Sequence, residues 1–244
     1  MKKTLSKWLP LGLFLIPLAA CQDEDKEPTP DIIEMNYTFE ANEEGWIGGF
    51  ADLPVEGQDI YELDISHSPL PEETDATGNS IRIQGHNRSD DLFMFLKKKL
   101  TGLSPSTTYQ VIFDIEMASQ YPQTAPGIGG GPGGSVFIKV GATPEEPLAV
   151  EEEEPVQNYL RMNIDKGNQA QEGTDMINIG TVGIEGEEYR YQLIQRGNSD
   201  RPISANTDPE GNLWLILGTD SGFEGLTVLY YNTVKMRLEK TRVL

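Results

Sequence analysis

The segment TTYQVIFDIEM, residues 107–117, decides the fold class. Its apolar side chains stand at every second position: Tyr109, Val111, Phe113, Ile115 and Met117. Alternation with a period of two places the apolar side chains of a β-strand on one face and the polar ones on the other. The segment therefore predicts a long strand with one face in a hydrophobic core and the other toward solvent.

The same period recurs along the chain, and no long stretch shows the 3.6-residue period of a helix. NLWLIL (212–217) is apolar on both faces, which predicts a central strand covered on both sides. In GLTVLYYNTVKMRL (225–238), one face is expected to carry Leu226, Val228, Tyr230, Val234, Met236 and Leu238, with Asn232 among them. About ten such strands, separated by loops rich in Gly, Pro, Asn and Asp, predict an all-β antiparallel β-sandwich or jelly roll.

The first residues carry an export signal. A basic start, MKKTLSK, precedes the apolar run WLPLGLFLIPL, and the sequence Leu18-Ala19-Ala20-Cys21 then resembles a lipobox. This resemblance implies a lipoprotein signal peptide over residues 1–20, cleavage before Cys21, and acylation of that cysteine. Cys21 is the only cysteine in the chain, so its lipidation would exclude disulfides, zinc–thiolate sites and cysteine nucleophiles.

An acidic tetrad, residues 22–25, follows the cysteine and resembles the surface-export signal of lipoproteins from the Bacteroidetes group. Residues 21–35 are predicted to be the lipidated cysteine and an acidic tether, and residues 36–244 a single β-sandwich domain. The expected location is the outer membrane, with a lipid anchor as the membrane contact and the domain facing the cell exterior. The periplasmic face is the alternative.

The chain carries 19 basic and 39 acidic residues, for a formal net charge of −20. Such a charge argues against a nucleic-acid partner, because a polyanion would be repelled. It is consistent with a solvated extracellular surface and with cation binding.

The stretch GTDSGFEG, residues 218–225, contains Asp-Ser-Gly, the string found at each catalytic carboxylate of aspartic proteases. That chemistry needs a second such triplet, which the chain lacks. The stretch is expected to be a glycine-punctuated loop after the central strand. It is either only a tight turn or a calcium loop in which Asp220 and Glu224 supply oxygen ligands.

Glycan binding needs aromatic rings that stack on sugars and polar groups that bond to hydroxyls. Candidate aromatic residues are Trp46 and Tyr121, and a polar run supplies Asn163, Asp165 and Asn168. The alternative interpretation of the polar run is an ordinary turn.

Three segments, in order and spacing, resemble carbohydrate-binding modules of the galactose-binding jelly-roll type. They are NYTFEANEEGW (36–46), LTGLSPSTTYQVIFDIEM (100–117) and LYYNTVKMRLEK (229–240). The resemblance implies a galactose-binding-like sandwich that binds glycans without transforming them, and it adds Glu40 and Asn232 to the candidate calcium ligands. The region 36–240 also resembles bacterial lipoproteins of no assigned activity. The alternatives are a structural or assembly lipoprotein with a calcium-stabilised sandwich, or a glycan-processing enzyme that uses two carboxylates.

Overall fold

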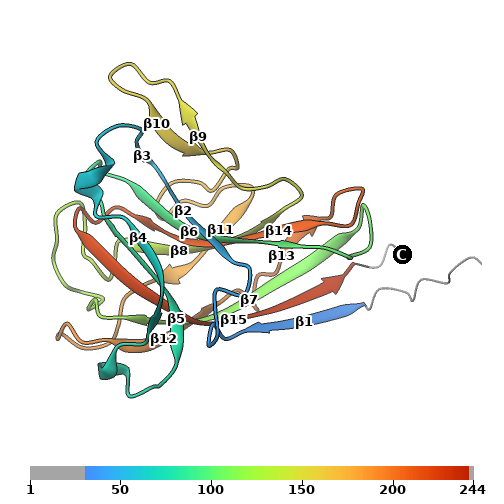
Figure 1. The fold of residues 1–244 in the computed structure, drawn as a ribbon, viewed down its shortest axis with the longest axis horizontal. Helices are drawn as coiled ribbons and strands as arrows, with labels where there is room; N and C mark the ends of the chain where they lie inside the picture. The colour runs from blue at the N-terminus through green and yellow to red at the C-terminus, as the bar shows by residue number, and fades with distance from the viewer. Residues whose placement is uncertain (1–30, 242–244) are drawn as a thin grey trace, which may run out of the picture.

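Two antiparallel β-sheets packed face to face form most of the chain that the computed structural model describes, residues 31–241 (Figure 1). This confirms the predicted all-β antiparallel β-sandwich. The predicted signal peptide, Cys21 and the acidic tetrad lie outside the described residues.

Sheet A has seven strands, with the order β12-β7-β15-β5-β4, while β1 pairs with β15 and β13 with β7. Their bounds are β1 Ile32–Tyr37, β4 Asp64–Pro69, β5 Asn79–His86, β7 Thr108–Ser119, β12 Gln192–Gly197, β13 Ile203–Asn206 and β15 Leu226–Lys240. Strand β1 begins before residue 36, the predicted start of the domain. Its residues Ile33 and Met35 pack against the core.

Sheet B has five strands in the order β11-β8-β14-β6-β2. They are β2 Ile47–Ala51, β6 Leu92–Leu100, β8 Val136–Thr143, β11 Met176–Thr181 and β14 Leu213–Ser221. The apolar NLWLIL segment lies in β14, at the centre of the sheet between β8 and β6, as its two-sided apolar pattern predicted. Successive long strands β5, β6, β7 and β8 alternate between the two sheets, as in a jelly roll.

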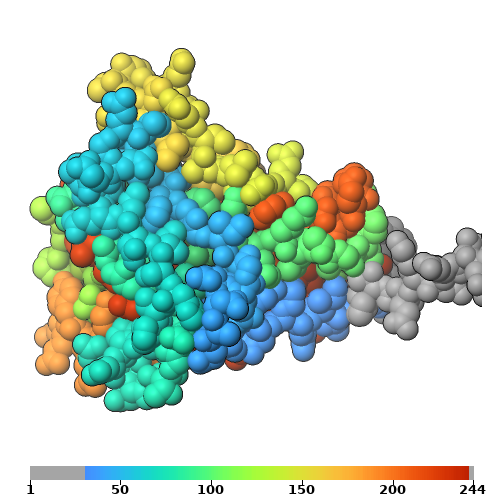
Figure 2. Space-filling model, viewed as in Figure 1, coloured from blue at the N-terminus to red at the C-terminus, as the bar shows by residue number. Residues whose placement is uncertain are grey.

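A small third sheet, β3-β10-β9, covers part of the outer face of sheet B. Its strands are β3 Leu53–Pro54, β9 Ala149–Glu152 and β10 Tyr159–Met162, and the β9–β10 hairpin projects at the top of Figures 1 and 2. Two short 3-10 helices, η1 Gln58–Tyr61 and η2 Glu72–Thr74, complete the described elements. These short pieces bring the described strands to fifteen, where the pattern predicted about ten.

The core lies between the sheets, and the alternating residues of β7 confirm the prediction made from them. Tyr109, Val111, Phe113, Ile115 and Met117 are all completely buried. Each such side chain contributes about 1.5–3 kcal/mol by leaving water. No helix among the described residues is long and apolar enough to cross a membrane.

The face predicted for the closing strand β15 is wrong in its first half. A β-bulge lies between Tyr231 and Thr233 in the pairing with β7. An extra residue in one strand reverses the faces on either side of it. Leu229 and Tyr231 therefore point into the core, while Tyr230 is half-buried on the outer face of sheet A.

Candidate functional site

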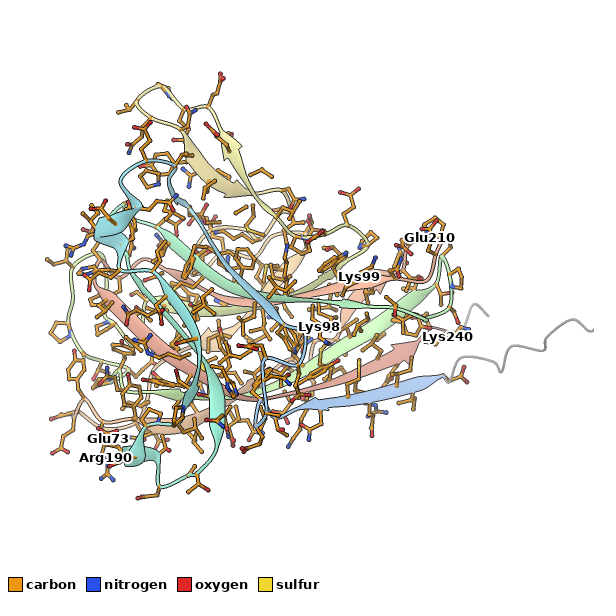
Figure 3. All side chains as sticks on the ribbon, in the orientation of Figure 1. Glu73, Lys98, Lys99, Arg190, Glu210 and Lys240 are labelled. Carbon is orange, nitrogen blue, oxygen red and sulfur yellow. The ribbon has the colours of Figure 1, made fainter. Side chains whose placement is uncertain are left out.

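Four tyrosines gather at one end of sheet A. Tyr121 follows β7, Tyr189 and Tyr191 precede β12, and Tyr230 lies in β15. The rings of Tyr121 and Tyr189 have centroids 6.5 Å apart at 89°, and those of Tyr191 and Tyr230 are 5.4 Å apart at 90°. Edge-to-face pairs of this kind hold aromatic rings in fixed positions. Arg190, labelled at the lower left of Figure 3 near Glu73, marks this end of the molecule.

A pocket of about 440 Å³ opens beside Tyr189. Its lining residues are Pro122, Thr124, Ala125, Pro126, Glu187 and Tyr189. Tyr189 is 56% exposed, which leaves much of its surface free for a ligand. The pocket lining therefore combines an aromatic ring and two prolines with the Thr124 and Tyr189 hydroxyls and one carboxylate.

Local backbone contacts hold the pocket walls together. The Ile184 N–H donates to the Tyr121 carbonyl at 2.9 Å, and the Gln123 N–H donates to the Ile184 carbonyl at 3.1 Å. At Gly183, a Cβ would lie 1.8 Å from the Gln123 Oε1 atom, so a larger residue there would push the Gln123 side chain aside. The loop that carries Tyr189 is thus pinned to the end of β7.

Tyr121, an aromatic residue predicted from the sequence to bind ligand, packs against the Tyr189 ring of this pocket. It is only 5% exposed, and its hydroxyl oxygen accepts the Val228 N–H at 2.7 Å. Burial raises the pKa of Tyr121 and also that of Tyr191, so both hydroxyls stay protonated. Tyr189 and Tyr191 were not predicted as site residues, although the alternation in EYRYQ places both on one side of an extended chain. Tyr230 was predicted only as a core residue of the closing strand.

A second polar feature, here called the charged cluster, lies between sheet B and the loop that follows β10. It consists of Asp52, Asp91, Lys139, Lys166 and Asp220. The Asp220 Oδ2 atom is 2.7 Å from the Lys166 Nζ atom and 3.0 Å from the Lys139 Nζ atom. Lys139 and Asp220 are both completely buried.

Protonation of Asp91 balances the charges of the cluster. Burial, followed by the charge of Asp220 and a hydrogen bond to it, raises the pKa of Asp91 to about 8. Burial opposes ionisation of Asp220, but Lys166 and the hydrogen bond from Asp91 hold its pKa below the ordinary value. With Asp91 protonated, two carboxylates face two ammonium groups and the buried net charge is zero.

Metal binding by the cluster depends on Lys166. One oxygen from each of Asp52, Asp91 and Asp220 lies within 4.8 Å of the others, a spacing that could hold a metal ion. The Lys166 Nζ atom, however, is 2.7 Å from both Asp52 Oδ2 and Asp220 Oδ2. The ammonium group therefore occupies the position between the carboxylates where a cation would bind.

The structure corrects the predicted loop over residues 218–225. Asp220 lies in β14, paired with Phe93 of β6 and Phe137 of β8, and only residues 222–225 form the connection to β15. Glu224 is exposed on that connection. Among residues 31–241, neither Glu224 nor Glu40 belongs to the carboxylate group around Asp220. Asn232 lies in sheet A, where its side-chain amide donates to Glu116 at 2.6 Å.

Two residues of the predicted polar run line a pocket together with members of the charged cluster. A pocket of about 220 Å³ is lined by Asp165 and Asn168 together with Asp52, Asp91 and Lys166. Asn163 instead links the two ends of the β9–β10 hairpin. Its side chain accepts the Leu148 N–H at 2.7 Å and donates to the Glu146 carbonyl at 3.0 Å.

Trp46 is a core residue and lines neither of these pockets. It is 4% exposed, and its ring packs edge-on against Tyr37 with centroids 5.6 Å apart. A ring so enclosed contributes to the core and offers no face to a sugar.

No protein-family model and no curated protein matches the chain. Among solved structures, similarity is found to the enzymatically active domain of bacteriophage CBA120 tailspike protein 4 (9% identity, TM-score 0.36, 81% of this chain and 20% of that one). It is also found to the CBM22-1–GH10 modules of Clostridium thermocellum xylanase 10B (12%, 0.38, 86% and 28%). A third similar structure is TmCBM27, a carbohydrate-binding module with specific mannan recognition (12%, 0.35, 86% and 99%). The chain thus spans well under a third of the length of the first two structures.

Proposed function

We propose that this protein is a non-catalytic glycan-binding module whose ligand enters the pocket beside Tyr189. The observation that carries the proposal is the exposed Tyr189 ring, which lines that pocket together with two prolines and Glu187. An aromatic ring presents a flat apolar surface to the C–H groups of a sugar. A carboxylate and a hydroxyl beside it accept and donate hydrogen bonds to sugar hydroxyls.

The contact with Tyr121 holds the Tyr189 ring in place, which makes this pocket suitable for binding. Tyr121 packs edge-on against Tyr189, and its own hydroxyl is held by the Val228 N–H. A ring fixed before the ligand arrives loses little conformational entropy on binding, which favours affinity. Such a pocket would bind a sugar ring without needing a reactive group.

The proposal includes attachment to the outer membrane through a lipid on Cys21, with the domain facing the cell exterior. The basic start, the apolar run and the lipobox-like sequence support this location, and the acidic tetrad supports surface exposure. A surface lipoprotein would place the Tyr189 pocket where extracellular glycans can reach it. The periplasmic face is the alternative orientation.

Glycan-array screening followed by isothermal titration tests the binding function. The comparison is wild type against Tyr189→Ala, with Tyr159→Ala on strand β10 as the matched control. We expect at least a tenfold loss of affinity for Tyr189→Ala, or about 1.4 kcal/mol, and no change for the control. Failure of the folded wild type to bind any glycan, or equal binding by Tyr189→Ala, would contradict the proposal.

The alternative function, an assembly lipoprotein with a calcium-stabilised sandwich, is favoured by one observation: the close approach of Asp52, Asp91 and Asp220. A calcium ion there would have to displace the Lys166 ammonium group, and calcium prefers six to eight oxygen ligands. The residues present therefore suit an internal ion-pair cluster better than a calcium site.

A further inference from the structure

We propose that Lys139 and Asp220 join in an intramolecular isopeptide bond that cross-links strands β8 and β14. The two strands are neighbours in sheet B, where Gly218 pairs with Lys139 and Asp220 pairs with Phe137. Lys139 and Asp220 therefore lie on the same outer face, two residue pairs apart along the ladder. Their side chains meet with the Lys139 Nζ atom 3.0 Å from the Asp220 Oδ2 atom, and both are completely enclosed.

The amine is held in place for attack on the carboxyl group. The Lys139 Nζ atom donates to the carbonyl oxygens of Lys166 at 2.7 Å and of Gln171 at 2.8 Å. Fixing two reacting groups about 3 Å apart makes an otherwise slow bimolecular reaction effectively unimolecular. Burial also lowers the pKa of Lys139, which increases the share of neutral, nucleophilic amine.

Donors surround the oxygen on which negative charge would develop. The Asp220 Oδ2 atom accepts the Lys166 ammonium group at 2.7 Å and the Gln169 N–H at 2.9 Å. Carboxylates around Lys166, those of Asp220, Asp52 and Asp91, outweigh burial and keep its pKa raised, so it stays charged. A fixed cation and a backbone N–H pointing at one oxygen stabilise a tetrahedral oxyanion.

The carboxyl group of Asp91 lies close to Asp220. One carboxyl oxygen of each residue lies within 4.8 Å of the other, and the buried Oδ1 atoms of both residues have no hydrogen-bond partner. Asp91 can therefore pass a proton to the Asp220 oxygen that leaves. This is the role of a general acid, and a nearby carboxyl group that is protonated at neutral pH is suited to it.

The step balances without any added reagent. The Lys139 Nζ–Asp220 Cγ bond forms, and the Cγ–Oδ1 bond breaks. The ammonium group of Lys139 gives up two protons, which Asp91 relays to the departing oxygen, so one water molecule leaves. The ion pair becomes a neutral amide, Asp91 ends protonated as it began, and nothing is oxidised or reduced.

The product would suit a protein outside the cell. A covalent link between adjacent strands in the middle of sheet B does not depend on a thiol, which the lipidated chain would lack. Enclosure of the amide would protect it from hydrolysis, and the cross-link would restrict the unfolded chain as a disulfide does.

Tandem mass spectrometry of the full chain tests the proposal after the protein is purified folded, denatured and digested. The expected product is a branched peptide that joins the Lys139 segment to the Asp220 segment and lacks the mass of one water molecule. Two separate linear peptides with intact masses would overturn the proposal. So would a branch at Lys166, or a water loss confined to the single peptide that contains Asp220.

Two variants examine the chemistry. Lys139→Arg keeps the charge but cannot form the amide, so the branched peptide should disappear. Asp91→Asn keeps the shape of the proton donor but cannot relay a proton, and it should slow bond formation about 100-fold. Asp64→Asn, an exposed acid on β4, serves as the matched control and should remain linked. Circular dichroism verifies that each variant folds, and full linkage in folded Asp91→Asn would contradict the assigned role of Asp91.

Discussion

Asp220 shows how much a single residue's meaning depends on its neighbours. The sequence places it beside Glu224 in a presumed loop, whereas the fold encloses it between Lys139 and Lys166. Removing Asp220 takes away the carboxyl group that compensates these ammonium groups, and it also removes one partner of the proposed cross-link.

We therefore expect Asp220→Ala to lower the free energy of unfolding by about 3–5 kcal/mol. Glu224→Ala, a change of an exposed acid in the same stretch, should alter it by less than about 0.5 kcal/mol. Urea titration followed by tryptophan fluorescence measures both. Equal effects of the two substitutions would show that the buried cluster does not stabilise the fold.

Asp165 is a second residue whose contribution to stability depends on its hydrogen bonds, although the residue is exposed. Its carboxylate accepts the N–H groups of Thr174 at 2.9 Å and Gly167 at 3.1 Å, and these bonds lower its pKa. Because its folded pKa lies below the unfolded one, its contribution is present at neutral pH. That contribution is lost as the pH falls through the folded pKa.

Asp165→Asn should therefore unfold more easily than wild type at neutral pH, and the difference should shrink in acid. Urea titrations at a series of pH values from about 7 to about 2.5 measure this. A difference that stays constant across the series would mean that ionisation of Asp165 contributes nothing. Asp200→Asn, in an exposed turn, provides the control.

At the scale of elements, strand β7 and strand β15 mark how far a period-two pattern can be read. In β7 every predicted core residue is buried, because the extra residue of its ladder with β15 lies on β15. In β15 the bulge near Asn232 reverses the faces, and Tyr230 turns outward toward Tyr191. Side-chain alternation does not show where an extra residue enters a ladder, since that depends on the partner strand.

The candidate sites follow the same division. Tyr121 was predicted from its aromatic character, but Tyr189 became prominent only when the loop before β12 closed over the end of β7. Likewise Asp91 and Asp220 are 129 positions apart in the sequence, by their residue numbers, and meet because β6 and β14 are neighbours. Contacts between such distant positions depend on sheet order, which a single sequence does not display.

For the whole molecule, we expect calcium to have little effect on stability. Lys166 already lies between Asp52 and Asp220, so a cation gains no vacant position. The midpoint of thermal unfolding should be the same with excess EGTA and with millimolar calcium. A midpoint that rises with calcium concentration would favour the calcium-stabilised assembly lipoprotein instead.

Membrane attachment is the second expectation at this scale. Cys21→Ser removes the acylation site, and the protein should then leave the membrane fraction while its folded domain remains intact. Cell fractionation followed by immunoblotting measures the distribution. Retention of Cys21→Ser in the outer-membrane fraction would contradict the lipid anchor. Ser6→Ala, within the signal, is the control and should remain membrane-bound.

The sequence by itself determined the all-β class, the buried face of β7 and the central place of β14, because these follow from the local period of apolar residues. The tertiary structure alone decided the outward turn of Tyr230, the Tyr189 pocket and the meeting of Lys139, Asp91 and Asp220. The physical reason is the distance along the sequence between the residues that determine each feature. Alternation is a property of neighbouring residues, whereas a binding pocket or a buried charge cluster requires side chains that only strand order and loop closure bring together.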